Sequence, residues 1–183
     1  MDPESARILA ECLIGAELPR RWAHVRAVAH KAAAIGRTLP AHEGAVLESA
    51  AWLHDIGYAT AAKRSGFHSL DGARYIGALG TDTRLCSLVA HHSGAAYEAG
   101  LRGLTAELAE FRDESSAVRD ALWFCDMTTG PDGTSMTFAD RLAEVEGRYG
   151  SKHVVTRAIN EASTDIRRAI VATEQRLSQS ACG

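Results

Sequence analysis

One stretch organises this chain, Trp52-Leu53-His54-Asp55-Ile56-Gly57. It ends an apolar segment with helical spacing, and His54 follows Leu47 by seven residues, so we expect both side chains on one face. Asp55 lies one position round the helix, near the edge of that face. An imidazole and a carboxylate that point inward need compensation, because burying an unpaired charge is costly. A divalent cation would provide it. The alternative is a helix C-terminus with a histidine near the dipole and a capping aspartate.

Length, composition and charge narrow the class of protein. At 183 residues the chain can bury a proper core, and we expect one domain over residues 1–183. The net charge of −3 argues against the broad basic surface of nucleic-acid binders, so no nucleic-acid polymer is expected as a partner. The absence of a signal peptide and of a membrane-length apolar run predicts a cytoplasmic protein without a membrane partner. Four cysteines without a CxxC pair are expected to be reduced thiols: Cys12, Cys86, Cys125 and Cys182.

Helical periodicity runs through the sequence. Only four prolines occur, and no segment shows the alternation of a β-strand. Thr137 and Asp140 resemble a capping box. These patterns predict an all-α, single-domain bundle of about eight to nine helices. The expected helices in the first half cover residues 5–17, 20–35, 40–56, 69 or 71 to 79, and 82 to 91 or 92. The stretch 95–112 is less regular and is expected to hold one helix that starts at residue 105. The remaining helices are expected at 114–128, 137–149 and 151–177, with loops at 59–68 and 129–134 and a frayed tail at 178–183.

Five of the eight histidines fall at helix faces or helix ends beside carboxylates. His24 lies on the apolar face of its helix, and His68 falls just before a helix. By spacing, His92 turns to the inward face of its helix while His91 is turned aside. Each has another explanation when taken alone. His24 can be a hydrogen-bonded core histidine, and His68 can be a neighbour of a helix N-cap without a ligand role.

A further helix brings a carboxylate to an apolar stripe. Asp126 follows Val118 by eight residues and Leu122 by four, so it lies on their face. It could instead pair with an arginine such as Arg21 or Arg26. Because three separate helices bring histidine or aspartate onto apolar faces, we favour a pocket for a hard or borderline divalent ion.

The order of these residues resembles a known family. His24, the pair His54-Asp55 and Asp126 follow one another as in the HD-domain superfamily of metal-dependent phosphohydrolases, an all-helical fold named for its adjacent His-Asp pair. The resemblance covers about residues 20–129, with the C-terminal helices 137–178 outside it. It implies that His24, His54, Asp55 and Asp126 hold a first metal.

Two segments resemble the dinuclear branch of that superfamily, which includes the HD-GYP phosphodiesterases and the diadenosine tetraphosphate hydrolases. Phe67-His68-Ser69-Leu70-Asp71-Gly72-Ala73 is similar to its His-Pro-x-x-Gly segment, and Ala90-His91-His92-Ser93-Gly94 to its second-histidine segment. This implies that His68 with His91 or His92 binds a second metal, bridged by Asp55. Tyr58 stands where those relatives commonly carry a lysine, and no Gly-Tyr-Pro follows His92. These departures argue against hydrolysis of cyclic dinucleotides.

The resemblance and the residues together suggest a metal-dependent phosphohydrolase, either a phosphomonoesterase or a phosphodiesterase. Its substrate would be a small phosphorylated compound, for example a nucleotide, attacked by metal-activated water at His54 and Asp55. An arginine or lysine would meet the remaining phosphate charge. Arg21, three residues from His24 and on its helix face, is the preferred candidate. Lys63, in the loop after the His-Asp pair, is another.

Other functions and several properties stay open at this point. The cofactor would be one or two divalent ions, with iron, manganese or another transition metal expected and magnesium allowed. A mixed-valent di-iron oxygenase of the same scaffold is one alternative, and a non-catalytic module that binds a nucleotide or metal is another. A homodimer is also left open.

Overall fold

The computed structural model describes residues 1–181. In this part of the chain regular structure is helical, apart from one isolated β-bridge between Thr129 and Ser135. Three short segments are not α-helical: the π-helical turn η1 (Glu11–Gly15) and the 3₁₀ turns η2 (Ile56–Tyr58) and η3 (His92–Gly94). The ten α-helices are α1 (Pro3–Ala10), α2 (Pro19–Gly36), α3 (Ala41–Leu53), α4 (His68–Ala78), α5 (Thr83–Ala90), α6 (Ala95–Arg102), α7 (Thr105–Leu108), α8 (Ala117–Met127), α9 (Phe138–Tyr149) and α10 (Val154–Ala181).

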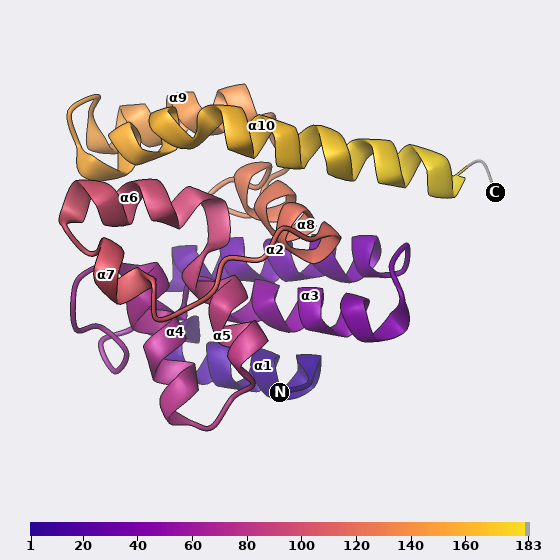
Figure 1. Ribbon diagram of the computed structural model, residues 1–183, viewed down its shortest axis with the longest axis horizontal. Helices are drawn as coiled ribbons and strands as arrows, with labels where there is room; N and C mark the ends of the chain where they lie inside the picture. Colours follow the sequence, from indigo (N-terminus) through magenta and orange to yellow (C-terminus); the bar gives the residue numbers. More distant parts are fainter. Residues whose placement is uncertain (182–183) are drawn as a thin grey trace.

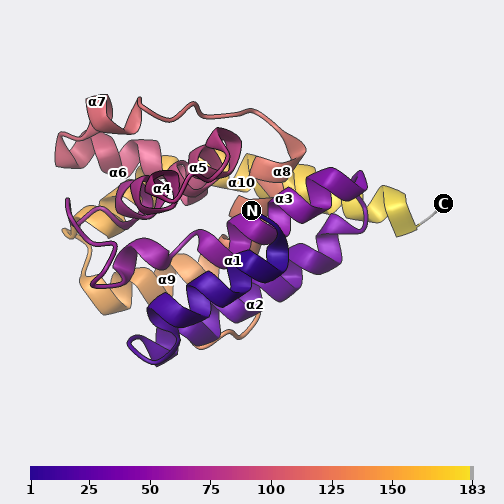
Figure 2. The same cartoon turned by 90° about the horizontal axis from the view of Figure 1, so that it is seen from below.

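The helices are arranged in layers (Figure 1). α2 and α3 lie side by side in the middle of the molecule, and α1 packs against α3 on one side. On the other side α9 and α10 form a layer, in which α10 packs on α6 and α8. The C-terminal end of α10 extends beyond the other helices, as Figure 2 shows from below.

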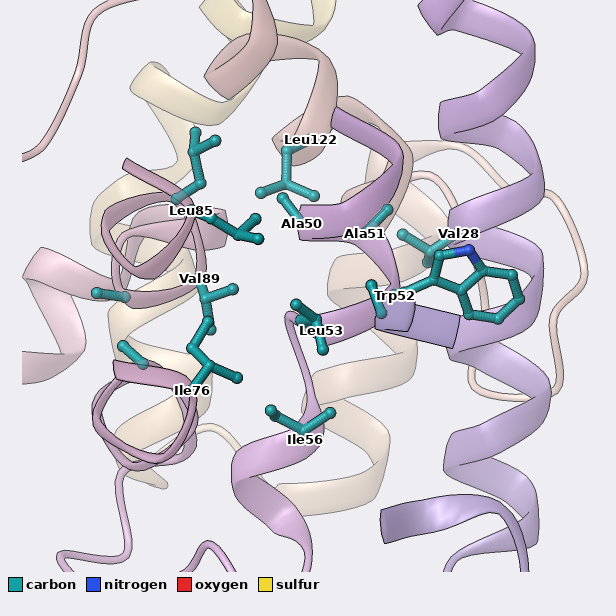
Figure 3. Packing of buried hydrophobic residues seen from close by; sticks show 14 of the residues in the cluster. Val28, Ala50, Ala51, Trp52, Leu53, Ile56, Ile76, Leu85, Val89 and Leu122 are labelled. Atoms are coloured by element: carbon teal, nitrogen blue, oxygen red, sulfur yellow. The ribbon is translucent and has the colours of Figure 1, made fainter. Parts of the chain in front are cut away.

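The main core is built around α3, the helix that ends at the His-Asp pair. Residues 47 and 50–53 of this helix are at most 4% exposed. Figure 3 shows Trp52 turned toward Val28 of α2, Ala50 beside Leu122 of α8, and Leu53 on the side of α4 and α5. Burying a side chain such as Leu53 stabilises the fold by about 2 kcal/mol. The apolar packing on three sides therefore holds the end of α3 in place.

α8 joins this core to a smaller one beneath the C-terminal layer. Its residue Leu122 belongs to the main core, whereas Trp123 and Met127 pack with Phe138 of α9 and Ile166 of α10. Because side chains one position apart leave a helix in different directions, a single helix can serve two cores. α8 thus links the two layers and carries Asp126 between them.

The prediction of an all-α bundle is confirmed. Ten α-helices exceed the expected eight to nine because stretch 95–112 holds two helices, which separate at Gly103 in the left-handed region (φ 71°). The helix predicted to run to residue 56 ends at Leu53, so His54 and Asp55 lie in the turn that leads into η2. The predicted capping box of Thr137 and Asp140 is present at the start of α9.

The last helix differs from its prediction at both ends. It begins at Val154 and not at residue 151, and the Val155 amide donates to His153 Nδ1 over 3.3 Å. It extends to Ala181, so residues 178–181 of the predicted frayed tail are helical. The rest of that tail, with Cys182, lies outside the described residues. Within residues 1–181 no helix combines the length and apolar character needed to cross a membrane.

Candidate metal centre

His54 is the C-cap residue of α3, directly after Leu53, and is fully buried, with 0% exposure. Its Nδ1 donates to the carbonyl of Ala51 over 2.8 Å, which satisfies one of the orphan carbonyls at the helix end. Nε2, at the other side of the ring, is buried and has no hydrogen-bond partner. The end of the helix therefore orients this ring so that Nε2 points into the interior.

Three side chains from separate helices converge on the first of two clusters. His24 of α2 has Nδ1 2.9 Å from the carbonyl of Gly130 and Nε2 3.0 Å from Asp126 Oδ1. His54 Nε2 lies 4.0 Å from the same Asp126 oxygen. The ligand atoms of His24, His54 and Asp126 all lie within 4.8 Å of one another, so they form a candidate metal site.

A second cluster adjoins the first and contains Asp55, His68 and His92. His68 Nε2 lies 3.5 Å from Asp55 Oδ1 and 3.1 Å from His92 Nε2. The Nδ1 atom of His92 donates to the carbonyl of Val89 over 2.7 Å, at the end of α5. As at His54, a helix-end carbonyl holds one ring nitrogen and leaves the other to face the cluster.

Asp55, a member of the second cluster, also faces the first. Its Oδ2 is 3.4 Å from His54 Nε2 and 3.9 Å from His24 Nε2, whereas Oδ1 faces His68. Arg21 of α2 donates from its NH1 nitrogen to Oδ2 over 2.6 Å. One carboxylate thus faces both clusters and holds an arginine at their edge.

Local packing sets the position of His68 at the start of α4. A Cβ on Gly57 would lie 1.9 Å from the His68 carbonyl oxygen, so only glycine allows this approach. The buried carboxylate of Asp71 accepts the backbone amides of Arg64, Ser65 and Gly66, which ties down the loop before α4. Together these contacts bring the His68 ring beside Asp55.

The charges of the site are set by burial and by close contacts. Burial alone would raise the pKa of Asp55, but Arg21 and the rings of His54 and His68 hold it well below its ordinary value. The pKa of Asp126 is likewise lowered against burial, by His24 and His54. Burial lowers the pKa of His54, but the carboxylates of Asp55 and Asp126 outweigh it and raise the pKa to about 9.

The two histidines of the second cluster behave differently. Burial lowers the pKa of His68 well below its ordinary value, and burial together with the nearby His54 lowers that of His92. Both rings are therefore neutral near pH 7. Neutral imidazole is the form of histidine that binds a metal.

The donor atoms of these residues suit a divalent cation. His24, His54 and His92 each have Nδ1 beside a backbone carbonyl, so in the neutral ring Nε2 carries the lone pair. The His24 lone pair then faces an oxygen of Asp126, and two acceptors 3.0 Å apart need a proton or a cation near them. Histidine and aspartate donors fit a transition metal, and the two clusters offer places for one or two ions.

Two residues expected near the site lie away from it. The ring of His91 points the other way, and its Nε2 donates to the carbonyl of Phe111 over 2.8 Å, because adjacent residues leave a helix about 100° apart. The structure brings His92 and not His91 into the cluster. Lys63 is exposed and does not line the cavity at the site. A catalytic role for Lys63 stays a prediction.

Several neighbours of the site were not expected from the sequence. Tyr58 stacks on His68 with ring centroids 4.2 Å apart, and the Arg21 guanidinium lies 3.8 Å from the Tyr58 ring centroid. Ser93 adopts a left-handed conformation (φ 50°), and its hydroxyl donates to Asp126 Oδ2. Arg141 and Arg148 of α9 also line the cavity. Their spacing of seven residues, which puts them on one helical face, was the available signal.

The cavity at the site is small and enclosed on one side by α9. Its volume is about 60 Å³, which is room for about two water molecules. Asp55, His68, His92 and Asp126 face it from the bundle, and Val145 from α9. A group held here would be surrounded by metal-binding side chains and arginine, with little bulk water.

Comparison with known proteins agrees with this geometry. The profile of the HD domain matches residues 21–122, which includes His24, His54, Asp55, His68 and His92 and stops just before Asp126. Neither the curated proteins nor the solved structures contain a match to the chain. The matched region covers more than half of the sequence and contains the adjacent His-Asp pair around which the buried clusters form. The chain belongs to the HD domain family, whose members are generally metal-dependent hydrolases.

Proposed function

We propose that this protein is a metal-dependent phosphohydrolase that acts on a small phosphorylated compound, with nucleotides as the first candidates. The observation that carries the proposal is the convergence of two groups of buried donor atoms next to an arginine. His24, His54 and Asp126 would hold a first ion, His68 and His92 a second, and Asp55, which faces both clusters, would serve both. When bound, a divalent ion supplies Lewis acidity toward a phosphoryl oxygen and a low pKa for water.

Backbone carbonyls and one hydroxyl around the clusters would keep these ligands in position. The carbonyls of Gly130, Ala51 and Val89 fix the ring orientations of His24, His54 and His92. Such outer contacts commonly change metal affinity or activity by about 10–100-fold when they are removed. The Ser93 hydroxyl, which donates to Asp126 Oδ2, holds that carboxylate in the same way.

Arg21 is the candidate for binding the phosphoryl group. It is held between Asp55 and the face of the Tyr58 ring, and it lines the cavity. A guanidinium placed in this way can donate to phosphoryl oxygens and offset the charge that develops on them. Apolar side chains from the C-terminal layer, among them Val145 and Ile159, restrict the access of water.

The proposal is tested by removing and restoring the metal. Protein purified without a metal-binding tag is assayed for phosphate release from p-nitrophenyl phosphate, bis(p-nitrophenyl) phosphate and a set of nucleotides. Chelation should abolish hydrolysis, and manganese or iron should restore it. Asp55→Asn should lower kcat/KM at least about 100-fold. Glu161→Gln removes one negative charge from an exposed side chain of α10 and should leave the rate unchanged.

Three results would contradict hydrolysis. Full hydrolytic activity of Asp55→Asn would show that the two clusters are not the catalytic site. Uptake of dioxygen with an organic substrate and two irons per chain, without phosphate release, would instead indicate the di-iron oxygenase. A nucleotide that binds the metal-loaded protein and is recovered unchanged would indicate a binding module.

A further inference from the structure

A second cavity lies next to the metal cavity and is rich in arginine. Its volume is about 310 Å³, and Arg20, Arg21, Arg141 and Arg148 line it. Arg21, Arg141 and Arg148 also line the metal cavity, so the two spaces share one wall of guanidinium groups. This is a local concentration of positive charge in a chain whose net charge is −3.

Arg141 is the most informative member of this group. It is 7% exposed, and its Nε atom is buried without a hydrogen-bond partner. Its NH1 nitrogen donates to Glu144 Oε2 over 2.6 Å, and Arg148 donates to the same oxygen over 2.8 Å. One carboxylate therefore serves two guanidinium groups. A buried donor that lacks an acceptor is costly, so an anionic ligand is the natural partner for Arg141.

The N-terminus of α2 contributes to the same cavity through Leu18, Pro19 and Arg20. This helix has 18 residues, no side-chain cap and no acidic residue in its first turn. Its free amides and dipole favour an anion, as at other helix N-termini. The arginines and the helix end thus attract the same kind of group.

Charge indicates which anion fits. Arg21 is paired with Asp55, so Arg20, Arg141 and Arg148 face the carboxylates of Glu17 and Glu144 with one positive charge in excess. A phosphate monoester carries about −1.5 to −2 charges at pH 7, whereas a carboxylate carries one. Planar guanidinium groups also match phosphate oxygens in pairs. A phosphate, with three acceptor oxygens, can therefore accept from several of these guanidinium groups at once, whereas a carboxylate offers two oxygens.

We propose that the arginine cavity binds a second phosphate group of the substrate, through Arg141 and Arg148 with Arg20 at its edge. The substrate class is then a compound with two phosphate groups, one at the metal clusters and one in the arginine cavity. The role of the first group rests on the proposed function, whereas the arginine cavity stands on its own contacts. Arg141 and Arg148 lie on α9, outside the part of the chain that matches the family.

The first experiment measures binding without catalysis. Inorganic phosphate is titrated calorimetrically into metal-free protein and into Arg148→Gln and Arg141→Gln variants. Each variant should weaken phosphate binding about tenfold or more, since a hydrogen bond to a charged group contributes about 1.5–3 kcal/mol. Arg157→Gln, which removes an exposed arginine of α10 whose carboxylate contact is at 3.8 Å, should bind as the wild type does. Equal binding by all four proteins, or none by the wild type, would overturn the proposal.

Arg141 is buried, so its loss could unfold the chain, and two variants guard against this. Arg148 has a side chain that is 26% exposed and can be changed with less risk to packing. Arg141→Lys keeps the charge and should bind phosphate more tightly than Arg141→Gln does. Circular dichroism establishes that each variant is folded before it is titrated.

The second experiment compares substrates that differ by one phosphate: adenosine 5′-monophosphate with adenosine 3′,5′-bisphosphate, and fructose 6-phosphate with fructose 1,6-bisphosphate. With metal-loaded wild type, kcat/KM should be at least about tenfold higher for a bisphosphate than for the matching monophosphate. Arg148→Gln should remove that preference, whereas Arg157→Gln, at an exposed side chain of α10, should keep it. If monophosphates are hydrolysed as well as bisphosphates, the proposal of a second phosphate in the arginine cavity is overturned, and the proposed hydrolase function is not. Phosphate binding by the arginines without any metal-dependent hydrolysis would overturn the proposed function alone.

Discussion

At the scale of single residues, backbone carbonyls decide which face of each histidine is available. Nδ1 of His24, His54 and His92 is tied to Gly130, Ala51 and Val89 respectively. The carbonyls of Ala51 and Val89 lie at helix ends, three residues before His54 and His92 respectively. The carbonyl of Gly130 comes from a loop far along the chain from His24. In each case the remaining nitrogen is the one that faces a carboxylate or another imidazole, which is the arrangement that a cation needs.

The raised pKa of His54 predicts how stability depends on pH in the metal-free protein. The pKa is about 9 in the folded chain and about 6.5 when unfolded. The resulting stabilisation is fully present below about pH 6.5 and is lost as the pH rises through about 9, because the folded state binds the proton more tightly. Its size is of order 3 kcal/mol. Urea unfolding of chelated protein at pH 6.5 and pH 9 measures the difference.

A matched pair of variants isolates this effect from other titrating groups. His54→Gln should flatten the loss of unfolding free energy between the two pH values. His42→Gln, at a side chain that is 75% exposed, should lose as much unfolding free energy between the two pH values as the wild type does. If His54→Gln and the wild type lose the same unfolding free energy, the ring does not carry the raised pKa.

At the scale of elements, the connection from α3 to α4 determines whether the second cluster forms. Tyr58 of η2 stacks on His68, and Gly57 lets the His68 backbone approach closely. Asp71 fixes the intervening loop through three backbone amides. The position of His68 is therefore a property of this connection as a whole.

Gly57→Ala tests that dependence. The added Cβ would lie 1.9 Å from the His68 carbonyl oxygen and 2.7 Å from the Gly72 amide nitrogen, so α4 must shift. We expect a loss of about 1–3 kcal/mol in unfolding free energy, as for overpacking in a core. Elemental analysis should show that the protein keeps the ion of the His24 cluster and loses that of the His68 cluster.

A glycine elsewhere provides the control for this substitution. Gly100 lies in α6, where an added Cβ would meet nothing within 4 Å. Gly100→Ala should therefore keep both the stability and the metal content of the wild type. Unchanged metal content in Gly57→Ala would show that His68 does not depend on this close contact.

At the scale of the whole molecule, the metal clusters join helices that lie far apart in the sequence. His24 comes from α2, His54 from α3, His68 from α4 and Asp126 from α8. A ligand that binds only the folded state stabilises it by about 2.7 kcal/mol at a concentration one hundred times its Kd. Metal binding is therefore coupled to the stability of the entire fold.

Removing the metal should lower the Tm of the wild type by roughly 5–10 °C, given the usual relation between unfolding free energy and Tm for a domain of this size. Differential scanning calorimetry with and without chelator measures the shift, and manganese should reverse it. Asp126→Asn, which lacks a ligand of the first cluster, should respond less to chelator. A wild-type Tm that does not change on chelation would contradict a metal bound by these helices.

The sequence by itself determined the class of fold and the family. Helical spacing placed His24 and Asp126 on apolar faces, and the pair His54-Asp55 at the end of an apolar helix pointed to the HD domain. Periodicity can do this because it reports the direction in which each side chain leaves its own helix. It does not report which helices meet.

Only the tertiary structure decided the contacts that join different helices. It turned His91 to the Phe111 carbonyl and His92 to His68. α10 packs on α8 and brings α9 back beside the site, so Arg141 lines a cavity with residues more than one hundred positions earlier in the chain. The physical reason is that the packing of apolar faces and the hydrogen bonds between distant segments set how helices lie against one another, and local sequence patterns contain neither.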